Sequence, residues 1–279
     1  MKKFELDLSL FSDVIICDYN YMFDPQVYLR RYFDDDRSKT LALVDEANNL
    51  VDRGRAMYSC SFSYESFKAA KKAIKELDHK KYKNAAKRIN NMFKELKELP
   101  DGNTVIQMFA PTHLNGIEAY VLACQDINKH HHTYATDEFL DFFFEINKFN
   151  KLLELFDDSF TLYVTKDEKD VVVNLFCLDP SPHLRKTFKQ IKGSIVFSAT
   201  MTPTDYYVKT LGGDENTPIL KLNSPFDHKN RKILVAPGAS IQYKKRNETL
   251  NKVVDYINKR NYFSEQYNDC FAAQKKAHE

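Results

Sequence analysis

Apolar and polar residues follow two different patterns in the N-terminal half of the chain. Short apolar runs at 13–18 and 41–45 each end in acidic or polar residues, which is typical of buried parallel strands, and a helical pattern beginning at Asp24-Pro25 separates them. From about 60 to 157 the apolar residues recur every three or four positions instead. This period predicts amphipathic helices with seams suited to antiparallel packing.

The first pattern returns in the C-terminal half. Residues 160–165 and 171–177 flank a charged turn and are predicted to form a hairpin, and 194–198 is predicted to be a buried strand. A further strand at 232–236 and a helix at about 246–260 would begin another unit. The whole pattern predicts an α/β fold in which an all-helical insertion interrupts a parallel sheet.

Size and composition narrow the class of protein. At 279 residues the chain is long enough for one large domain or two ordinary ones. Its formal net charge of +2 gives no global attraction to nucleic acid, so any basic surface must be local. The sequence has neither an 18-residue apolar run nor a signal-peptide pattern, so we expect a cytoplasmic protein without a membrane partner.

Cysteine and histidine give little indication of a metal or redox site. The five cysteines are scattered with no C-x-x-C pair, which favours buried apolar side chains over a zinc site or disulfides. The run His130-His131-His132 falls at the end of a helical pattern. Because adjacent helical residues point to different faces, a solvated helix terminus is favoured there over a metal site.

Charge is distributed unevenly over the predicted insertion. Residues 68–97 carry eleven Lys and Arg against three acids, whereas 134–158 carry seven acids against two Lys. Either the basic helices present a face to nucleic-acid phosphates, or basic and acidic helices neutralise each other across the bundle. On the first interpretation the candidate phosphate contacts are Lys68, Lys71, Lys72, Lys75, Lys87 and Arg88.

The phenylalanine-rich segment 139–149 presents a similar choice. Exposed aromatic rings would suit stacking on bases. The phenylalanines instead recur at the spacing of one helical face, which favours the core of the bundle.

The apolar run 41–44 leads directly into Asp45 and Glu46. Open α/β sheets bind ligands at the carboxyl ends of their strands, where an NTPase needs an acid for Mg²⁺ and a second group for the attacking water. The sequence contains no G-x-x-x-x-G-K-[ST] phosphate loop, so it supplies half of an ATP site. The alternative is that the two acids cap the helix that follows.

Six short motifs occur in a fixed order along the chain. They are Tyr19-Asn20-Tyr21, Asp45-Glu46-Ala47-Asn48, Cys177-Leu178-Asp179-Pro180-Ser181, Ser198-Ala199-Thr200-Met201-Thr202-Pro203, Leu211-Gly212 and Ser224-Pro225-Phe226. In this order, with a helical insertion between the second and third, they resemble the XPD/DinG-type group of DEAH-box, superfamily 2 DNA helicases. The second motif stands where that family has its Walker B sequence, and the fourth resembles its motif III.

The resemblance implies a partial RecA-like motor domain interrupted by an arch domain. It places the first part of the motor at 1–56, the arch at 57–157 and the second part of the motor at 158–228. Residues 229–279 would then be the truncated start of a second motor domain.

The resemblance also implies a function, ATP-driven 5′→3′ translocation on single-stranded DNA in DNA repair or replication. Asp45 would hold Mg²⁺ and Glu46 would activate water, while Asn48 takes the place of the DEAH histidine. Ser198 and Thr200 would couple the nucleotide state to the grip on DNA. As strand-end hydroxyls, the same two residues could equally cap the next helix.

The chain departs from the family pattern in three respects. Asn48 replaces a histidine and cannot carry a charge. The phosphate loop and the iron–sulfur cysteines, which precede the Walker B motif in the family, are absent from this sequence. After Asn261 the sequence no longer follows a second motor domain, as a truncation or frameshift would produce.

We therefore expect a helicase fragment without ATPase activity of its own. Its partners would be single-stranded DNA and, where one exists, a separate N-terminal part of the motor. Two alternatives remain open: a non-catalytic nucleic-acid-binding or interaction module, and a decayed helicase remnant without activity.

Overall fold

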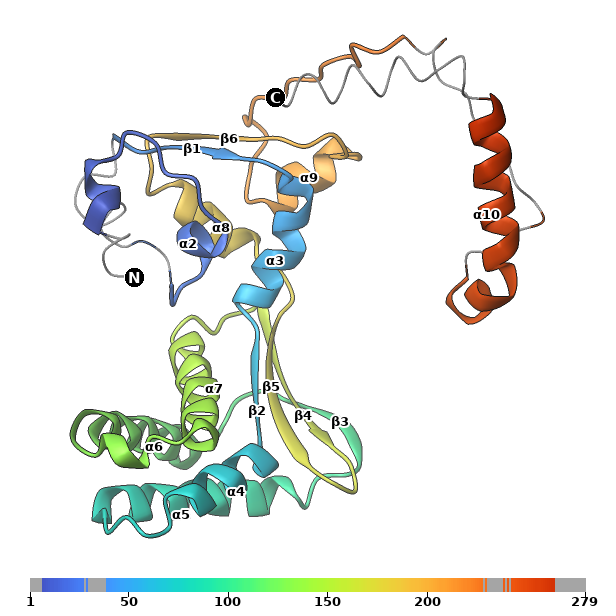
Figure 1. Ribbon diagram of the computed structural model, residues 1–279. Helices are drawn as coiled ribbons and strands as arrows, with labels where there is room; N and C mark the ends of the chain where they lie inside the picture. The colour runs from blue at the N-terminus through green and yellow to red at the C-terminus, as the bar shows by residue number, and fades with distance from the viewer. Residues whose placement is uncertain are drawn as a thin grey trace. The chain divides into compact units, whose positions relative to one another are not determined.

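The computed structural model describes residues 7–27, 29, 39–227, 229, 238, 240 and 242–263. The chain divides into two compact units, 1–218 and 219–279, which we describe separately. The first unit combines a parallel strand pair and its helices with a larger lobe built on an antiparallel sheet (Figure 1).

A parallel strand pair confirms the α/β prediction. β1 (Leu41–Val44) pairs with β6 (Gly193–Val196) in parallel register, from Leu41↔Gly193 to Val44↔Val196. The short elements around this pair are η1 (Ser9–Phe11), α2 (Asn20–Phe23), η4 (Ala47–Asn49), α3 (Leu50–Met57), α8 (Ser181–Phe188) and α9 (Thr204–Thr210). In Figure 1, α3 and α8 lie on the same side of the strand pair.

The two faces of this strand pair differ in burial. Val44 is buried in the core with Leu50 and Leu184, whereas Leu43 and Ile195 remain 73% and 63% exposed. An apolar run that predicts burial on both faces is therefore buried on one face only.

Residues 13–18 do not form the predicted strand. They are irregular, and the side chains of Val14 and Ile16 are exposed. A buried parallel strand requires a neighbour, and in the described part of the chain β1 pairs with β6 alone. The helix predicted from Asp24-Pro25 is a turn at 25–27, and most of its remaining length lies outside the described residues.

The predicted helical stripes in the insertion are confirmed. The helices are α4 (Tyr64–Ala73), α5 (Lys80–Leu96), α6 (Pro111–His130) and α7 (Asp137–Leu153), and most apolar positions of each stripe are buried. Phenylalanines fill the centre of the lobe: the Phe67 ring lies 5.9 Å from that of Phe93 and 5.5 Å from that of Phe142. This aromatic core joins α4, α5 and α7.

The insertion is not all-helical, however. β2 (Cys60–Ser63) and β3 (Gly102–Ile106) fall inside it and pair with the predicted hairpin of β4 (Phe160–Lys166) and β5 (Val171–Cys177). The resulting antiparallel sheet has the order β2-β5-β4-β3. An isolated hairpin leaves unpaired backbone groups along both edges, and these two strands satisfy them. Both segments are too short to reveal a strand period in the sequence.

Side chains that cap the backbone explain where several helices begin. Ser63 Oγ accepts a hydrogen bond from Ser66 N (3.0 Å) at the start of α4, and His79 Nδ1 accepts one from Tyr82 N (3.1 Å) at the start of α5. At its other end, α6 terminates at His130, so the histidine run does mark a helix terminus.

Burial of the cysteines follows the prediction only in part. Cys124 and Cys177 are buried, and burial raises the pKa of the Cys177 thiol to about 12. Cys60 is partly buried, whereas Cys17 is exposed because segment 13–18 is not packed as a strand. Cys270 lies outside the described residues.

The second unit contains η7 (Tyr243–Lys245) and α10 (Arg246–Phe263), which confirms the helix predicted at about 246–260. The strand predicted at 232–236 lies outside the described residues. Among the helices that the structure describes, none is both long and apolar enough to cross a membrane.

Candidate functional site

The acidic motif and the S-A-T segment follow neighbouring parallel strands at the same edge. Phe197 N donates to Val44 O (2.9 Å), and Ala47 N donates to Phe197 O (3.1 Å). These two hydrogen bonds continue the parallel ladder one step beyond β1 and β6. The segments that follow the two strands therefore lie side by side.

Ser198 lies at the centre of the side-chain cluster that results. Its hydroxyl oxygen is 2.6 Å from the side-chain amide of Asn48 and 3.4 Å from Glu46 Oε2. It also lies 3.4 Å from Thr200 Oγ1 and accepts a hydrogen bond from Thr200 N (3.2 Å). The structure thus brings Glu46, Asn48, Ser198 and Thr200 together.

The orientation of the Asn48 amide follows from its neighbours. With its nitrogen facing the site, Asn48 donates to Ser198 Oγ (2.6 Å) and to Glu46 Oε2 (3.1 Å). The opposite orientation would place the amide oxygen beside a carboxylate oxygen, and two acceptors repel each other. We assign the first orientation, in which Asn48 links the Glu46 carboxylate to the Ser198 hydroxyl.

Glu46 has an unusual backbone conformation. Its φ of 48° and ψ of 38° lie in the left-handed region, and no other residue except glycine among those described has a positive φ. For a residue with a Cβ this conformation costs about 1–2 kcal/mol, so surrounding contacts must hold it. One of them is local, since Glu46 N donates to Asp45 Oδ1 (2.7 Å).

The two carboxylates suit a magnesium site that is completed by a substrate. Asp45 and Glu46 are both exposed at the strand end. Mg²⁺ is commonly held by one or two protein carboxylates together with phosphate oxygens and water. No group of three or more His, Cys, Asp or Glu within the described ranges is arranged to hold a metal ion by itself. The donor set therefore fits a shared metal–phosphate site and not a closed protein cage.

Tyr19 also belongs to the site, although its residue type does not predict a role there. Its hydroxyl lies 2.6 Å from Asp45 O and 2.9 Å from Glu46 O, so its single proton is shared between two carbonyl oxygens. Burial, followed by the negative charges of Glu46 and Asp45, raises the pKa of the phenol. The only signal in the sequence is the position of the Tyr19-Asn20-Tyr21 motif shortly before the acids.

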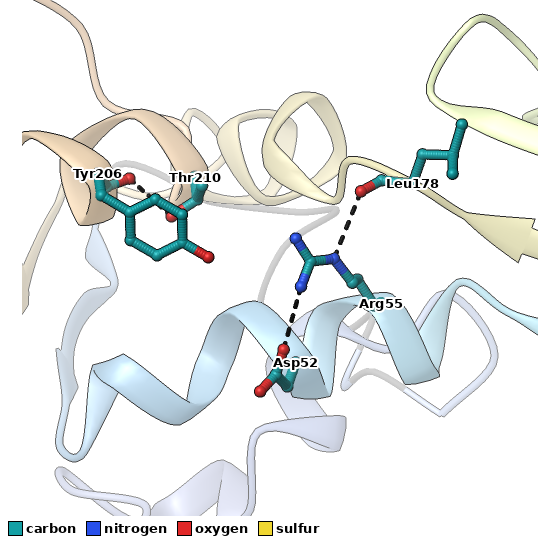
Figure 2. Close-up of polar contacts among 5 residues, drawn as sticks. All are labelled: Asp52, Arg55, Leu178, Tyr206 and Thr210. Atoms are coloured by element: carbon teal, nitrogen blue, oxygen red, sulfur yellow. Dashed lines mark hydrogen bonds and ion pairs between the residues drawn. The ribbon is translucent and has the colours of Figure 1, made fainter.

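The helix that follows the acids is fixed by Arg55. Figure 2 shows this side chain extending from α3: Nε donates to Leu178 O (3.3 Å), and Nη1 pairs with Asp52 Oδ1 (3.1 Å). At the same junction, a Cβ added to Gly54 would lie 3.0 Å from Pro180 Cβ. α3 therefore packs closely against the Cys177–Ser181 motif.

The six candidate phosphate contacts are all exposed, four on α4 or just after it and two on α5. Lys75 pairs with its neighbour Glu76 (3.4 Å), and the Lys68 ammonium lies 5.1 Å from the Tyr64 ring. Within the described ranges, the other four make no ion pair: Lys71, Lys72, Lys87 and Arg88. Among the described residues, no ion pair joins these four cations to the acidic α7.

The phenylalanines of α7 form bundle core, as predicted. Phe139, Phe142, Phe143 and Phe149 are buried, and Phe144 alone among the phenylalanines of this helix is largely exposed. Buried rings cannot stack on bases, so a base-stacking role for this stripe is excluded.

Asp157, Ser159 and His183 form a hydrogen-bonded polar cluster in which Ser159 and His183 are buried and Asp157 is exposed. Ser159 Oγ donates to Asp157 Oδ1 and lies 3.0 Å from His183 Nε2, whose ring stacks on Tyr58 at 4.5 Å. The hydroxyl proton of Ser159 is directed to Asp157, so the histidine is not placed to accept it and the set does not form a nucleophilic triad. Burial lowers the pKa of His183. This polar cluster is structural.

Comparison with known proteins locates one family segment. Residues 7–67 match the family model described as DEAD_2. No curated protein matches the chain. Among solved structures, the chain is similar to one titled "XPD_Helicase", with 21% identity over 75% of this chain and 36% of that one and a TM-score of 0.49.

Two further structures have similar titles. "Truncated XPD" shows 20% identity over 78% of this chain and 60% of that one, with a TM-score of 0.49. "Structure of S. tokodaii Xpd4" shows 15% identity over 88% of this chain and 50% of that one, with a TM-score of 0.44. This chain thus spans between about a third and three fifths of the length of these proteins.

The segment matched by the family model contains Tyr19, Asp45, Glu46 and Asn48. The acidic motif and the Tyr19-Asn20-Tyr21 motif thus both lie in the segment that matches the DEAD_2 family model.

Proposed function

We propose that this chain forms the metal- and water-side half of the ATP site of a DNA helicase motor. One observation carries the proposal: Glu46, which follows Asp45 at the end of β1, is joined to Ser198 after β6 through Asn48. An acid pair that only capped a helix would need no contact with a segment 150 positions away.

Each residue then has a distinct chemical role. Asp45 would hold Mg²⁺, which neutralises charge on the transferred phosphate. Glu46 would orient the attacking water and accept its proton. By donating to Glu46 Oε2 (3.1 Å), Asn48 would hold that carboxylate in one direction.

The same hydrogen bonds provide a route for coupling. Ser198 contacts Asn48 on one side and Thr200 on the other. A displacement of Glu46 during hydrolysis would therefore also move the segment that leads to α9. In the whole protein this segment would link hydrolysis to translocation on single-stranded DNA, in the 5′→3′ direction and in repair or replication, as the motif resemblance implies.

ATP turnover by this chain alone should be negligible. Most stabilisation of a phosphoryl-transfer transition state comes from a phosphate loop and its lysine, and this sequence contains no such loop. The motor would need a partner segment that supplies it. We place the working protein in the cytoplasm.

Metal binding tests the proposal without requiring turnover. Mn²⁺ takes the same oxygen ligands as Mg²⁺ and is visible by electron paramagnetic resonance. We expect ATP to increase Mn²⁺ binding by the wild-type chain, and Asp45→Asn to abolish the increase. Asp52→Asn is the matched control, because it removes an exposed carboxylate from the adjacent α3. Equal Mn²⁺ binding by wild type and Asp45→Asn would refute the proposal.

A binding-module function is the second candidate, favoured by the unpaired cations on α4 and α5. We expect single-stranded DNA to bind with little sequence preference and with an affinity that falls steeply with salt. Replacing Lys71 and Lys72 with Gln should reduce the slope of log K against log salt by about 0.7 for each DNA phosphate that the variant no longer neutralises.

The matched control replaces Lys151 and Lys209 with Gln, which removes the same charge from exposed sites elsewhere. An equal loss of affinity in both double variants would show that net charge matters and α4 does not. DNA binding that is independent of Asp45 and of ATP would favour the binding module over the motor.

A further inference from the structure

The backbone of the two acids is held by a residue that lies outside the acidic and S-A-T motifs. Both carbonyl oxygens, Asp45 O and Glu46 O, face the hydroxyl of Tyr19, at 2.6 and 2.9 Å. On the other side, Ala47 N donates to Phe197 O (3.1 Å). The left-handed turn at Glu46 is therefore clamped between one hydroxyl and one carbonyl.

Tyr19 is itself firmly anchored. It precedes α2, and its carbonyl oxygen accepts hydrogen bonds from Met22 N (3.0 Å) and Phe23 N (2.8 Å). Phe23 is buried, and its own carbonyl oxygen accepts a hydrogen bond from the Tyr58 hydroxyl (3.1 Å). The phenol therefore extends to the acids from a backbone that is fixed in the core.

The clamp controls the direction of both carboxylates. A left-handed residue turns the chain sharply, so the side chains on either side of the Asp45–Glu46 peptide depend on that one conformation. A rotation of this peptide would move the Asp45 carboxylate and separate Glu46 from Asn48 at the same time. Groups that orient metal-binding side chains commonly matter about tenfold or more for metal affinity.

We propose that Tyr19 is a positioning residue: its hydroxyl holds the left-handed Asp45-Glu46 turn and so sets the affinity of the two acids for a divalent cation. The proposal rests on the function proposed above and adds a residue to that site. It requires the hydroxyl alone, because the Tyr19 ring and backbone would keep their packing in a phenylalanine variant.

The test compares Tyr19→Phe with wild type and with Tyr21→Phe, which removes a hydroxyl from an exposed tyrosine of α2, the helix that follows Tyr19. The measurements are Mn²⁺ affinity with ATP present and the amide resonances of Asp45, Glu46 and Ala47. We expect Tyr19→Phe to shift these resonances and weaken Mn²⁺ binding by about tenfold. Tyr21→Phe should leave both unchanged, and circular dichroism should show that both variants are folded.

Two results would overturn the role of Tyr19. One is unchanged amide resonances at 45–47 in Tyr19→Phe; the other is shifted resonances with wild-type Mn²⁺ affinity. Failure of the underlying function gives a different result, since the wild-type chain would then show no Asp45-dependent Mn²⁺ binding. In that case the amide resonances still decide whether Tyr19 holds the turn.

Discussion

Ser198 Oγ and the side-chain amide of Asn48 lie 2.6 Å apart although the two residues are separated by 150 positions in the sequence. The whole insertion lies between them in the chain. Their contact depends on the parallel pairing of β1 with β6, so it reports on the integrity of the site and of the sheet together.

Ser198→Ala should loosen this contact without unfolding the protein. It removes the hydroxyl that bonds Asn48 and accepts from Thr200 N. We expect a loss of about 0.5–1.5 kcal/mol in the free energy of unfolding, measured with urea, together with a shift of the Asn48 side-chain amide resonance. Ser194→Ala, on the exposed part of β6, is the control. An unshifted Asn48 resonance would contradict the assigned hydrogen bond.

Stability should fall on mild acidification because of His183. Burial holds the pKa of His183 below its ordinary value, so the unfolded chain takes up this proton more readily than the folded one. Protonation therefore favours unfolding, and the loss begins as the pH falls through about 6.5, the unfolded value. The hydrogen bond from Ser159 lowers the pKa of Asp157, which adds a loss of the same sign at lower pH.

Urea unfolding between pH 7 and 5 measures this effect. His183→Phe keeps a ring against Tyr58 and should flatten the dependence of stability on pH. His132→Gln, at an exposed position, should retain the wild-type dependence. The assignment to His183 fails if wild type and His183→Phe lose stability in parallel.

Gly212→Ala should be strongly destabilising for two separable reasons. Gly212 has a φ of +85°, and an added Cβ would lie 2.7 Å from Ser181 O and 2.8 Å from Arg185 N. Gly102 has a φ of +98° with nothing within 4 Å of such a Cβ, so Gly102→Ala isolates the backbone strain. We expect about 1 kcal/mol for Gly102→Ala and at least about 2 kcal/mol for Gly212→Ala in chemical denaturation. Equal losses would show that the contacts around Gly212 relax freely.

Two tyrosines share a hydrogen bond inside the helical lobe. The hydroxyls of Tyr82 and Tyr120 lie 3.1 Å apart, and burial raises the pKa of both phenols. Tyr120→Phe leaves the Tyr82 hydroxyl buried without this partner, which should cost about 1–3 kcal/mol. The double Phe variant should cost less than the sum of the single variants, and a double-mutant cycle measures the difference. Additive losses would mean that the two hydroxyls do not interact.

Local periodicity explains which parts of the fold can be predicted from the sequence. The stripe of α7 repeats over several turns, so Phe139, Phe142 and Phe149 are predicted in the core and are found there. β2 and β3 depend on backbone pairing with β5 and β4, and their sequences carry no comparable signal. Segment 13–18 has the apolar composition of a strand, but composition does not guarantee a neighbouring strand.

Some residues of the candidate site can likewise be predicted from the sequence, and one cannot. Asp45, Glu46, Ser198 and Thr200 are named by motifs, and their proximity is expected from the order of those motifs. The contribution of Tyr19 could not be predicted, because its hydroxyl bonds carbonyl oxygens that every residue possesses. When a side chain donates to a distant backbone carbonyl, the residue that carries the carbonyl can be of any type, so the sequence does not reveal the hydrogen bond.

Two segments of the chain connect the insertion to the site, and these two segments pair with each other as strands. One runs from α3 into β2 and the other from β5 towards α8; β2 and β5 pair from Cys60↔Leu175 to Ser63↔Val172, and Arg55 of α3 donates to Leu178 O just after β5. Sliding of one segment past the other would require breaking the backbone pairing of β2 with β5. A second tie joins the two parts, because Lys148 of α7 donates to Ala56 O of α3 (3.5 Å). A displacement of the helical lobe would therefore strain α3, the helix that follows the acids.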